Sequence, residues 1–190
     1  MTPVSRFSAR LLEIVTDPMV LQRLPEPVRL ASGEMSREFI DAKLAVDDPD
    51  DLDLVGQAML DAARQANVEF DAVGGLVLGA VPFTFAVAAA ARCKWFLIRK
   101  EPKGRGTNRW IEGARITKGM RILLVEDVAT TGGSIRDAYE RVVVEGGDVV
   151  FATTLVDRGD QAGGFFRGVG VPYVAMLTYR DLGIEPVGSG

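Results

Sequence analysis

One stretch of the sequence, residues 121–134, places an apolar run, two carboxylates, a glycine turn and a helix start in direct succession. The run Ile122–Val125 is followed by Glu126 and Asp127, and a Thr-Thr-Gly-Gly turn begins at Thr130. After the turn, apolar residues recur at helical spacing, at Ile135, Ala138, Tyr139, Val142 and Val143. The order predicts that a buried strand ends at the acidic pair of an open α/β sheet, where ligands bind beyond the carboxyl ends of the strands.

The turn between the carboxylates and the helix has the features of an anion site. A helix N-terminus presents unpaired backbone N–H groups and the positive end of the helix dipole. Gly132 and Gly133 allow the backbone to approach a ligand closely and to adopt positive φ. The hydroxyls of Thr130, Thr131 and Ser134 can donate further hydrogen bonds. The turn therefore predicts a phosphate site.

The two acidic residues do not suit a ligand that consists of phosphate alone. Glu126 and Asp127 would repel an anion, but they can accept hydrogen bonds from sugar hydroxyls or attract a metal ion. Their position beside the turn favours a ribose phosphate. The alternative is structural: Ser134 would cap the helix and Asp137 would complete a capping box. Capping accounts for those two residues and leaves the acidic pair and the threonines without a role.

Histidine is absent from the 190 residues, and cysteine occurs once, as Cys93. The lack of histidine excludes Ser-His-Asp and Cys-His triads and histidine-ligated metals. A single cysteine excludes an internal disulfide and a cysteine-based zinc cluster. Any proton transfer must therefore use carboxylates, lysine, tyrosine, water or the substrate itself.

The composition indicates a single domain over residues 1–190, because 47% hydrophobic residues can bury one full core. The N-terminus lacks the apolar stretch of a signal peptide. The longest apolar stretch, near residues 81–91, contains a proline and is too short to cross a bilayer. We therefore expect a soluble, cytoplasmic protein without a membrane partner.

Positive charge is concentrated in one part of an acidic chain. The net charge is −4, yet residues 99–118 hold seven basic and two acidic side chains. A basic island on an acidic protein indicates a small polyanionic ligand, whereas nucleic acid usually requires a basic domain. Between residues 100 and 113 apolar periodicity is weak and glycines are frequent, which predicts a mobile lid able to neutralise a diphosphate.

The remaining patterns predict a core over about residues 50–182 and a small N-terminal hood over about 1–45. In the hood we expect a helix over 5–17 and two antiparallel strands, 28–30 and 39–43. In the core we expect a helix from the acidic turn 47–51 to about 66, a helix over 82–91, and strands over 72–78, 95–98, 149–156 and 173–178. The tail, 185–190, is expected to be loose.

Residues 121–134 resemble the phosphoribosyl-diphosphate (PRPP) signature of type I phosphoribosyltransferases. Four further segments resemble orotate phosphoribosyltransferases: RLASGEMSREFIDAK from Arg29, GGLVLGAVP from Gly74, RKEPKGRGTNRWIEG from Arg99 and VDRG from Val156. The resemblance implies the type I phosphoribosyltransferase fold: a Rossmann-like α/β core, a mostly parallel sheet flanked by helices, with the hood beside it. It also implies transfer of the 5-phosphoribosyl group from PRPP to orotate, with Mg²⁺, and a homodimer whose lid reaches the partner's site.

The same resemblance assigns roles to individual residues. It implies PRPP contacts from Arg99, Lys100, Lys103, Arg105, Glu126, Asp127, Val128, Ala129, Thr130, Thr131, Gly132, Gly133 and Ser134. Lys100, Lys103, Arg105 and Asp127 would be catalytic, and Mg²⁺ would be held through PRPP and water, with no direct ligand from the chain. Orotate contacts would come from Ser32, Gly33, Lys43, Thr130 and Arg158. Arg158 offers a planar fork suited to a carboxylate, and the alternative for it is a surface Arg–Asp pair.

At three positions the sequence departs from the family pattern. Ala31 stands where some members carry a substrate-contacting lysine, Val81 where many carry an acidic residue, and Arg105 where histidine is frequent. Two alternatives therefore stay open beside the orotate reaction. One is a PRPP-dependent paralogue that uses another base, and the other is a non-catalytic PRPP-binding regulator.

Overall fold

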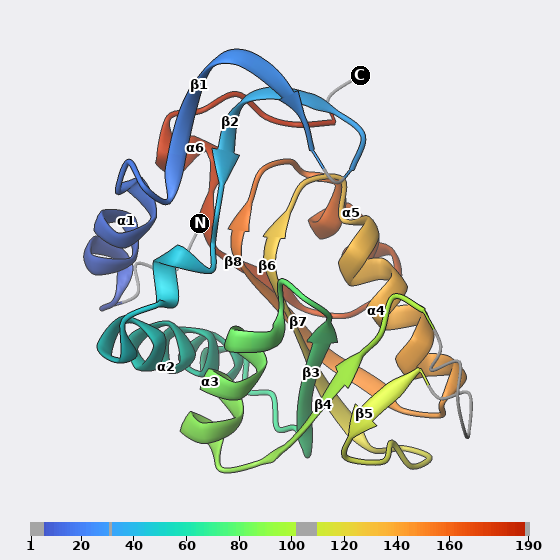
Figure 1. Ribbon diagram of the computed structural model, residues 1–190. Coiled ribbons are helices and arrows are strands. Elements are labelled where there is room, and N and C mark those ends of the chain that lie inside the picture. The colour runs from blue at the N-terminus through green and yellow to red at the C-terminus, as the bar shows by residue number, and fades with distance from the viewer. Residues whose placement is uncertain (1–5, 31, 102–109, 189–190) are drawn as a thin grey trace.

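A mostly parallel six-stranded sheet forms the centre of the protein (Figure 1). The computed structural model describes residues 6–30, 32–101 and 110–188. The strand order is β5-β4-β3-β6-β7-β8, and only β5 runs antiparallel to its neighbour. The strands are β3 Ala72–Leu76, β4 Lys94–Ile98, β5 Ile111–Gly113, β6 Arg121–Ala129, β7 Asp148–Asp157 and β8 Tyr173–Thr178. This arrangement confirms the predicted α/β fold.

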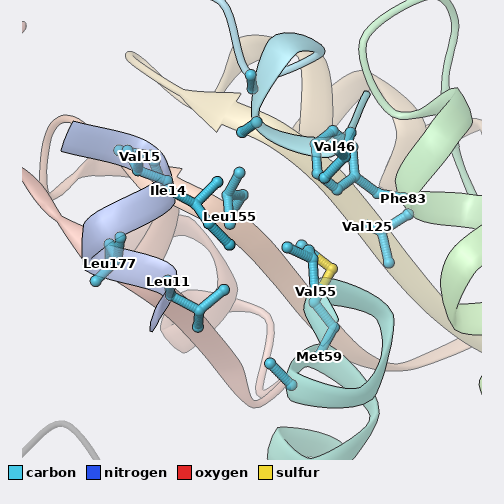
Figure 2. Close-up of a cluster of buried hydrophobic side chains, with 14 of the residues drawn as sticks. Leu11, Ile14, Val15, Val46, Val55, Met59, Phe83, Val125, Leu155 and Leu177 are labelled. Atoms are coloured by element: carbon cyan, nitrogen blue, oxygen red, sulfur yellow. The ribbon is translucent and has the colours of Figure 1, made fainter. Parts of the chain in front are cut away.

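Helices cover both faces of the sheet. Helices α1 (Ser8–Thr16), α2 (Pro49–Gln65) and α3 (Val81–Ala91) pack on one face, and α4 (Gly133–Val144) and α5 (Gln161–Gly168) pack on the other. A short helix, α6 (Tyr179–Leu182), follows β8. Each face has its own hydrophobic cluster, and Figure 2 shows the α1–α2–α3 side, where Leu11, Val55 and Met59 meet Leu155 of the sheet.

The apolar run in β6 is continuous because both faces of this central strand are covered. Leu123 and Val125 belong to the cluster under α1, α2 and α3, whereas Ile122 and Leu124 belong to the cluster under α4 and α5. All four side chains are at most 1% exposed. Alternation along a strand sends successive side chains to opposite faces, so a strand buried on both faces must be apolar throughout.

Helix α2 begins as the acidic turn predicts. The side chain of Asp48 accepts a hydrogen bond from the backbone N–H of Asp50, and Pro49 occupies the first turn, where its missing N–H has no cost. Asp50 and Asp51 complement the positive end of the helix dipole. The buried face of the helix then includes Ala58, Met59, Ala62 and Ala63.

The hood strands are longer than predicted. Strand β1 (Leu21–Arg29) and strand β2 (Met35–Ile40) form an antiparallel hairpin, followed by a single 3-10 turn, Leu44–Val46. Pro25 and Pro27 lie inside β1, and the register shifts between Arg23 and Val28. Proline lacks a backbone N–H and is tolerated at an edge or an irregularity of a strand, so the pattern concealed the first half of β1.

Other boundaries also differ from the predictions. Strand β6 does not stop at Val125 but continues through the acidic pair to Ala129, because it pairs with the long strand β7 as far as Asp157. Strand β5 occupies the end of the expected lid and pairs with β4. The tail is anchored at Val187, which is buried and whose N–H donates to the Arg158 carbonyl at 2.7 Å.

No helix in the described part of the chain is long and apolar enough to cross a membrane.

Candidate active site

A cleft of about 480 Å³ lies at the carboxyl ends of β3, β6 and β7, next to the hood hairpin. It is lined by residues from the loop after β3, the end of β4, the β6–α4 segment and the hairpin. Most of the predicted site residues meet there: Ser32, Lys43, Lys100, Glu126, Asp127, Val128, Ala129, Thr130, Thr131, Gly132, Gly133, Ser134 and Arg158.

Two of the predicted residues that the structure describes, Gly33 and Arg99, do not line this cleft. Gly33 lies in the turn of the hairpin and does not line it. Arg99 lines a neighbouring cavity of about 500 Å³, which shares Lys100 with the cleft. Lys103 and Arg105 lie outside the described residues, as does Ala31.

The N-terminus of α4 borders the cleft without any side-chain cap. Gly132 is the N-cap residue with φ +71°, and no acidic residue occurs in the first turn. A Cβ at Gly132 would come within 3.0 Å of the Ala162 backbone, so both the backbone angle and the space require glycine here. The alternative in which Ser134 and Asp137 form a capping box is therefore wrong. The free first-turn N–H groups remain available to an anion.

The two residues of the acidic pair differ in burial. Glu126 is 3% exposed, its Oε1 accepts from the backbone N–H of Asp127 at 3.1 Å, and its Oε2 has no partner among the described residues. Burial raises the pKa of the Glu126 carboxyl well above its ordinary value, and the neighbouring Asp127 adds to the shift while Lys100 opposes it. Asp127 is half-buried, and its Oδ1 accepts from the N–H of Val128 at 2.8 Å.

The loop after β3 fixes Asp127 from the other side. A Cβ at Gly79 would collide with the Asp127 carboxyl group, so glycine at this position lets the two loops approach. Val77 and Leu78 precede it and also line the cleft, and Leu78 is 70% exposed. The sequence analysis placed both residues in the strand predicted over 72–78, which is wrong because β3 ends at Leu76. Their only signal is an apolar run that continues past the end of the buried strand.

Arg158, at the end of β7, is almost fully buried, with 1% of its surface exposed. Its Nη1 donates to the Glu38 carbonyl at 2.8 Å and its Nη2 donates to Ser36 Oγ at 3.0 Å. The surface Arg–Asp pair is therefore wrong, because the guanidinium is buried and both terminal nitrogens donate to β2. Burial lowers the pKa of this guanidinium, and the nearby Glu38 opposes that shift.

Ser36 and Glu38 are site residues that sequence reasoning missed. Ser36 is buried at an inward-facing position of β2 between exposed neighbours. A small polar residue at an inward position of a strand is the one signal that could have found it.

Arg99, which follows β4, already has partners. Arg99 Nε donates to the Glu101 carbonyl at 3.2 Å, and its Nη1 lies 3.6 Å from a carboxylate oxygen of Glu112. In the same cavity the Arg141 guanidinium lies 3.5 Å above the Trp110 ring. On the hood side of the cleft, the Lys43 Nζ is 2.6 Å from Asp41 Oδ1.

The chain matches the family model of the phosphoribosyl transferase domain over residues 45–163. The matched segment contains the central strands through β7 and the loop between β6 and α4. Fold and cleft together therefore define a phosphoribosyltransferase.

Comparison with individual relatives identifies which kind of phosphoribosyltransferase the chain resembles. The orotate phosphoribosyltransferase of Methanothermobacter thermautotrophicus is 39% identical over 171 residues, which are 90% of this chain and 91% of that protein. That of Streptomyces coelicolor is 42% identical over 164 residues, 83% of this chain and 88% of that protein. The crystal structure of Mycobacterium tuberculosis orotate phosphoribosyltransferase in complex with PRPP superposes with a TM-score of 0.73 at 32% identity and covers 94% of this chain and 99% of that one. The chain belongs to the orotate phosphoribosyltransferase family and is a pentosyltransferase.

Proposed function

We propose that the cleft transfers the 5-phosphoribosyl group of PRPP to orotate, in the presence of Mg²⁺, and releases orotidine 5′-phosphate and diphosphate. The observation that carries the proposal is the meeting of three features in one cleft: the uncapped start of α4, the acidic pair of β6 and the buried Arg158. We infer further that residues 1–190 act as one phosphoribosyltransferase domain.

The 5-phosphate is proposed to bind at residues 130–134. Backbone N–H groups of the first turn of α4 point away from the helix, where a phosphate can accept from them, and the dipole favours its charge. Hydroxyls of Thr130, Thr131 and Ser134 line the same part of the cleft. The segment from Val128 to Ala129 places this turn at the end of β6.

The ribose is proposed to lie between the turn and the acidic pair, so that Glu126 and Asp127 contact its hydroxyls. As the bond from C1 to the diphosphate loosens, positive charge develops on the sugar, and a fixed carboxylate close to it stabilises that state. Asp127 suits this task because Val128 and the Gly79 loop hold it in place. Glu126 suits hydrogen bonding to a hydroxyl, because its Oε2 has no partner among the described residues.

Mg²⁺ is proposed to be held through PRPP oxygens and water. The ion prefers six oxygen ligands and gives up its water reluctantly, so diphosphate oxygens, ribose hydroxyls and water can complete its coordination. Within the described residues, no group of three or more acidic, histidine or cysteine side chains is placed to hold a metal ion. When bound, Mg²⁺ would neutralise charge on the leaving diphosphate.

Orotate is proposed to lie against the hood. Arg158 Nε is buried and has no hydrogen-bond acceptor among the described residues, so it is available as a donor to the base. Thr130, Ser32 and Lys43 line the same cleft, and Gly33 lies in the adjoining hairpin turn.

The diphosphate is proposed to be gripped by Arg99, Lys100, Lys103 and Arg105 from a lid over about residues 100–113. The charge distribution supports the lid, and Lys100 lies at the junction of the cleft and the neighbouring cavity. We further propose a homodimer in which each lid serves the partner's site, and a cytoplasmic location.

The test mixes the protein with Mg²⁺, PRPP and orotate and follows the loss of orotate absorbance. Asp127→Asn is expected to lower kcat/KM by about 10²–10³-fold, the usual effect of removing a group that stabilises transition-state charge. Arg158→Ala is expected to raise KM for orotate by about 10–100-fold, the effect of one hydrogen bond to a charged group. If both variants keep the wild-type constants, the site assignment is wrong. PRPP binding without turnover would instead indicate a regulator.

A further inference from the structure

The buried guanidinium of Arg158 is anchored by the hood rather than by its own strand. A guanidinium carries five N–H donors and no acceptor, and each donor that is buried without a partner destabilises the fold. Strand β2 supplies the acceptors for both terminal nitrogens, from positions about 120 residues away in the sequence: the Glu38 carbonyl for Nη1 and Ser36 Oγ for Nη2.

Ser36 is itself held in one orientation. Its Oγ donates to Glu38 Oε2 at 3.1 Å and accepts from the backbone N–H of Glu38 at the same distance. Since the hydroxyl proton is directed to the carboxylate, the oxygen lone pairs remain for Arg158 Nη2. Glu38 Oε2 also lies 3.8 Å from Nη2, so the carboxylate, the hydroxyl and the guanidinium form one connected group.

We propose that Ser36 is a positioning residue for base recognition, which acts by holding the Arg158 guanidinium at the wall of the cleft, where Nε is its one nitrogen without a partner among the described residues. This inference rests on the proposed function for the identity of the base. Two hydrogen bonds to β2 fix the plane of the guanidinium, so they also fix the directions of its remaining N–H donors. A small rotation of the guanidinium would therefore weaken the contact with the base and leave the PRPP end of the cleft intact.

The side chain of Ser36 faces the opposite way from those of its two neighbours in β2. Ser36 is buried, whereas Met35 and Arg37 on either side of it are exposed, because adjacent residues of a strand face opposite ways. Arg37→Ala is therefore the matched control: it lies in the same strand, and its side chain is on the other face. Ser36→Thr is the conservative variant, because it keeps the hydroxyl.

The kinetic test compares these variants. Ser36→Ala is expected to raise KM for orotate by about 10-fold, which corresponds to about 1.4 kcal/mol, with little change in KM for PRPP. Arg37→Ala should keep both constants, and Ser36→Thr should recover most of the loss. In the Arg158→Ala background, Ser36→Ala should add nothing to KM for orotate, because the residue through which it acts is gone. An unchanged KM for orotate, or an equal further increase in that background, would overturn the proposal.

A second readout does not depend on turnover. In ¹H–¹⁵N spectra of the full chain, the Arg158 Nε–H is expected to give a slowly exchanging signal that Ser36→Ala broadens or removes and Arg37→Ala leaves in place. If this signal survives Ser36→Ala, the positioning role is wrong whatever the substrate. If the signal is lost while the wild-type chain converts no orotate, the positioning role stands and the proposed function falls.

Discussion

Asp157 shows how a single residue at the edge of the site links pH to stability. It is 5% exposed, and burial raises the pKa of its carboxyl to about 6, although the Gly159 N–H and the Tyr173 hydroxyl both donate to it and oppose the shift. The native state therefore binds this proton more tightly than the unfolded chain does, whose carboxyl has a pKa of 3.8. The sign follows from linkage: stability falls as pH rises from about 4 through 6, because the native state must then bury a charge.

Asp157→Asn should remove that pH dependence, since the amide stays neutral. From pH 4 to pH 7, the unfolding free energy of the variant minus that of the wild type should rise by about 2 kcal/mol, because the pKa shift from 3.8 to about 6 counts 1.36 kcal/mol per unit and is not fully expressed at pH 4. Urea unfolding at several pH values measures the difference. Asp148→Asn, an exposed aspartate at the start of the same strand, is the control for removing a carboxylate. A difference that stays flat across this range would show that Asp157 is not the group responsible.

At the scale of elements, the start of α4 depends on the backbone of Gly132. Gly132→Ala is expected to destabilise the protein by about 1–2 kcal/mol from the left-handed φ alone, and contact with Ala162 adds to that cost. Because the turn would shift, KM for PRPP should rise by about 10-fold or more. Thermal unfolding and steady-state kinetics measure the two effects.

Gly170→Ala is a control that separates the effect of backbone strain from the effect of shifting the turn at the start of α4. Gly170 has φ +74°, and a Cβ there would meet nothing within 4 Å. This variant should lose comparable stability from the backbone angle but keep the wild-type KM for PRPP. If Gly170→Ala raised KM for PRPP as much as Gly132→Ala did, general destabilisation rather than the shape of the turn would explain both.

The sequence predicted well those elements whose start signals and apolar pattern lie within one continuous segment. Helix α2 has its cap, its acidic first turn and its apolar face in one continuous segment, and the apolar run of β6 identifies a strand covered on both faces. The end of β6 could not be predicted, because the acidic pair looks like a loop and stays in the strand only through pairing with β7. Strand β5 was hidden for the same reason, since three residues acquire their structure from β4.

The candidate site divides in the same way: the sequence indicated its contiguous motif but not the contacts between distant segments. Residues 126–134 form one contiguous motif, and the structure places all of them at the cleft. The contacts of Arg158 with Ser36 and Glu38 join segments about 120 residues apart, and no local pattern encodes such a pairing. Likewise, the need for glycine at Gly79 becomes evident only in the structure, where the loop after β3 contacts Asp127.

On the scale of the whole molecule, the proposed homodimer makes a prediction about mixtures of inactive chains. If each lid serves the partner's cleft, a lid variant and a cleft variant are inactive for different reasons. A mixed dimer of the two then contains one site in which a normal lid closes over a normal cleft. Lys103→Ala chains would supply that dimer with a normal cleft, and Asp127→Asn chains would supply it with a normal lid. Each variant alone should be nearly inactive.

Equal amounts of the two variants, unfolded together and refolded to exchange subunits, should recover about a quarter of the wild-type rate per chain, since half the dimers are mixed and each has one working site. Sedimentation or light scattering on the same sample confirms the dimer. Refolding each variant alone is the control, because neither should gain activity. A mixture that stays as inactive as its components, while remaining dimeric, would mean that each lid closes over the cleft of its own chain.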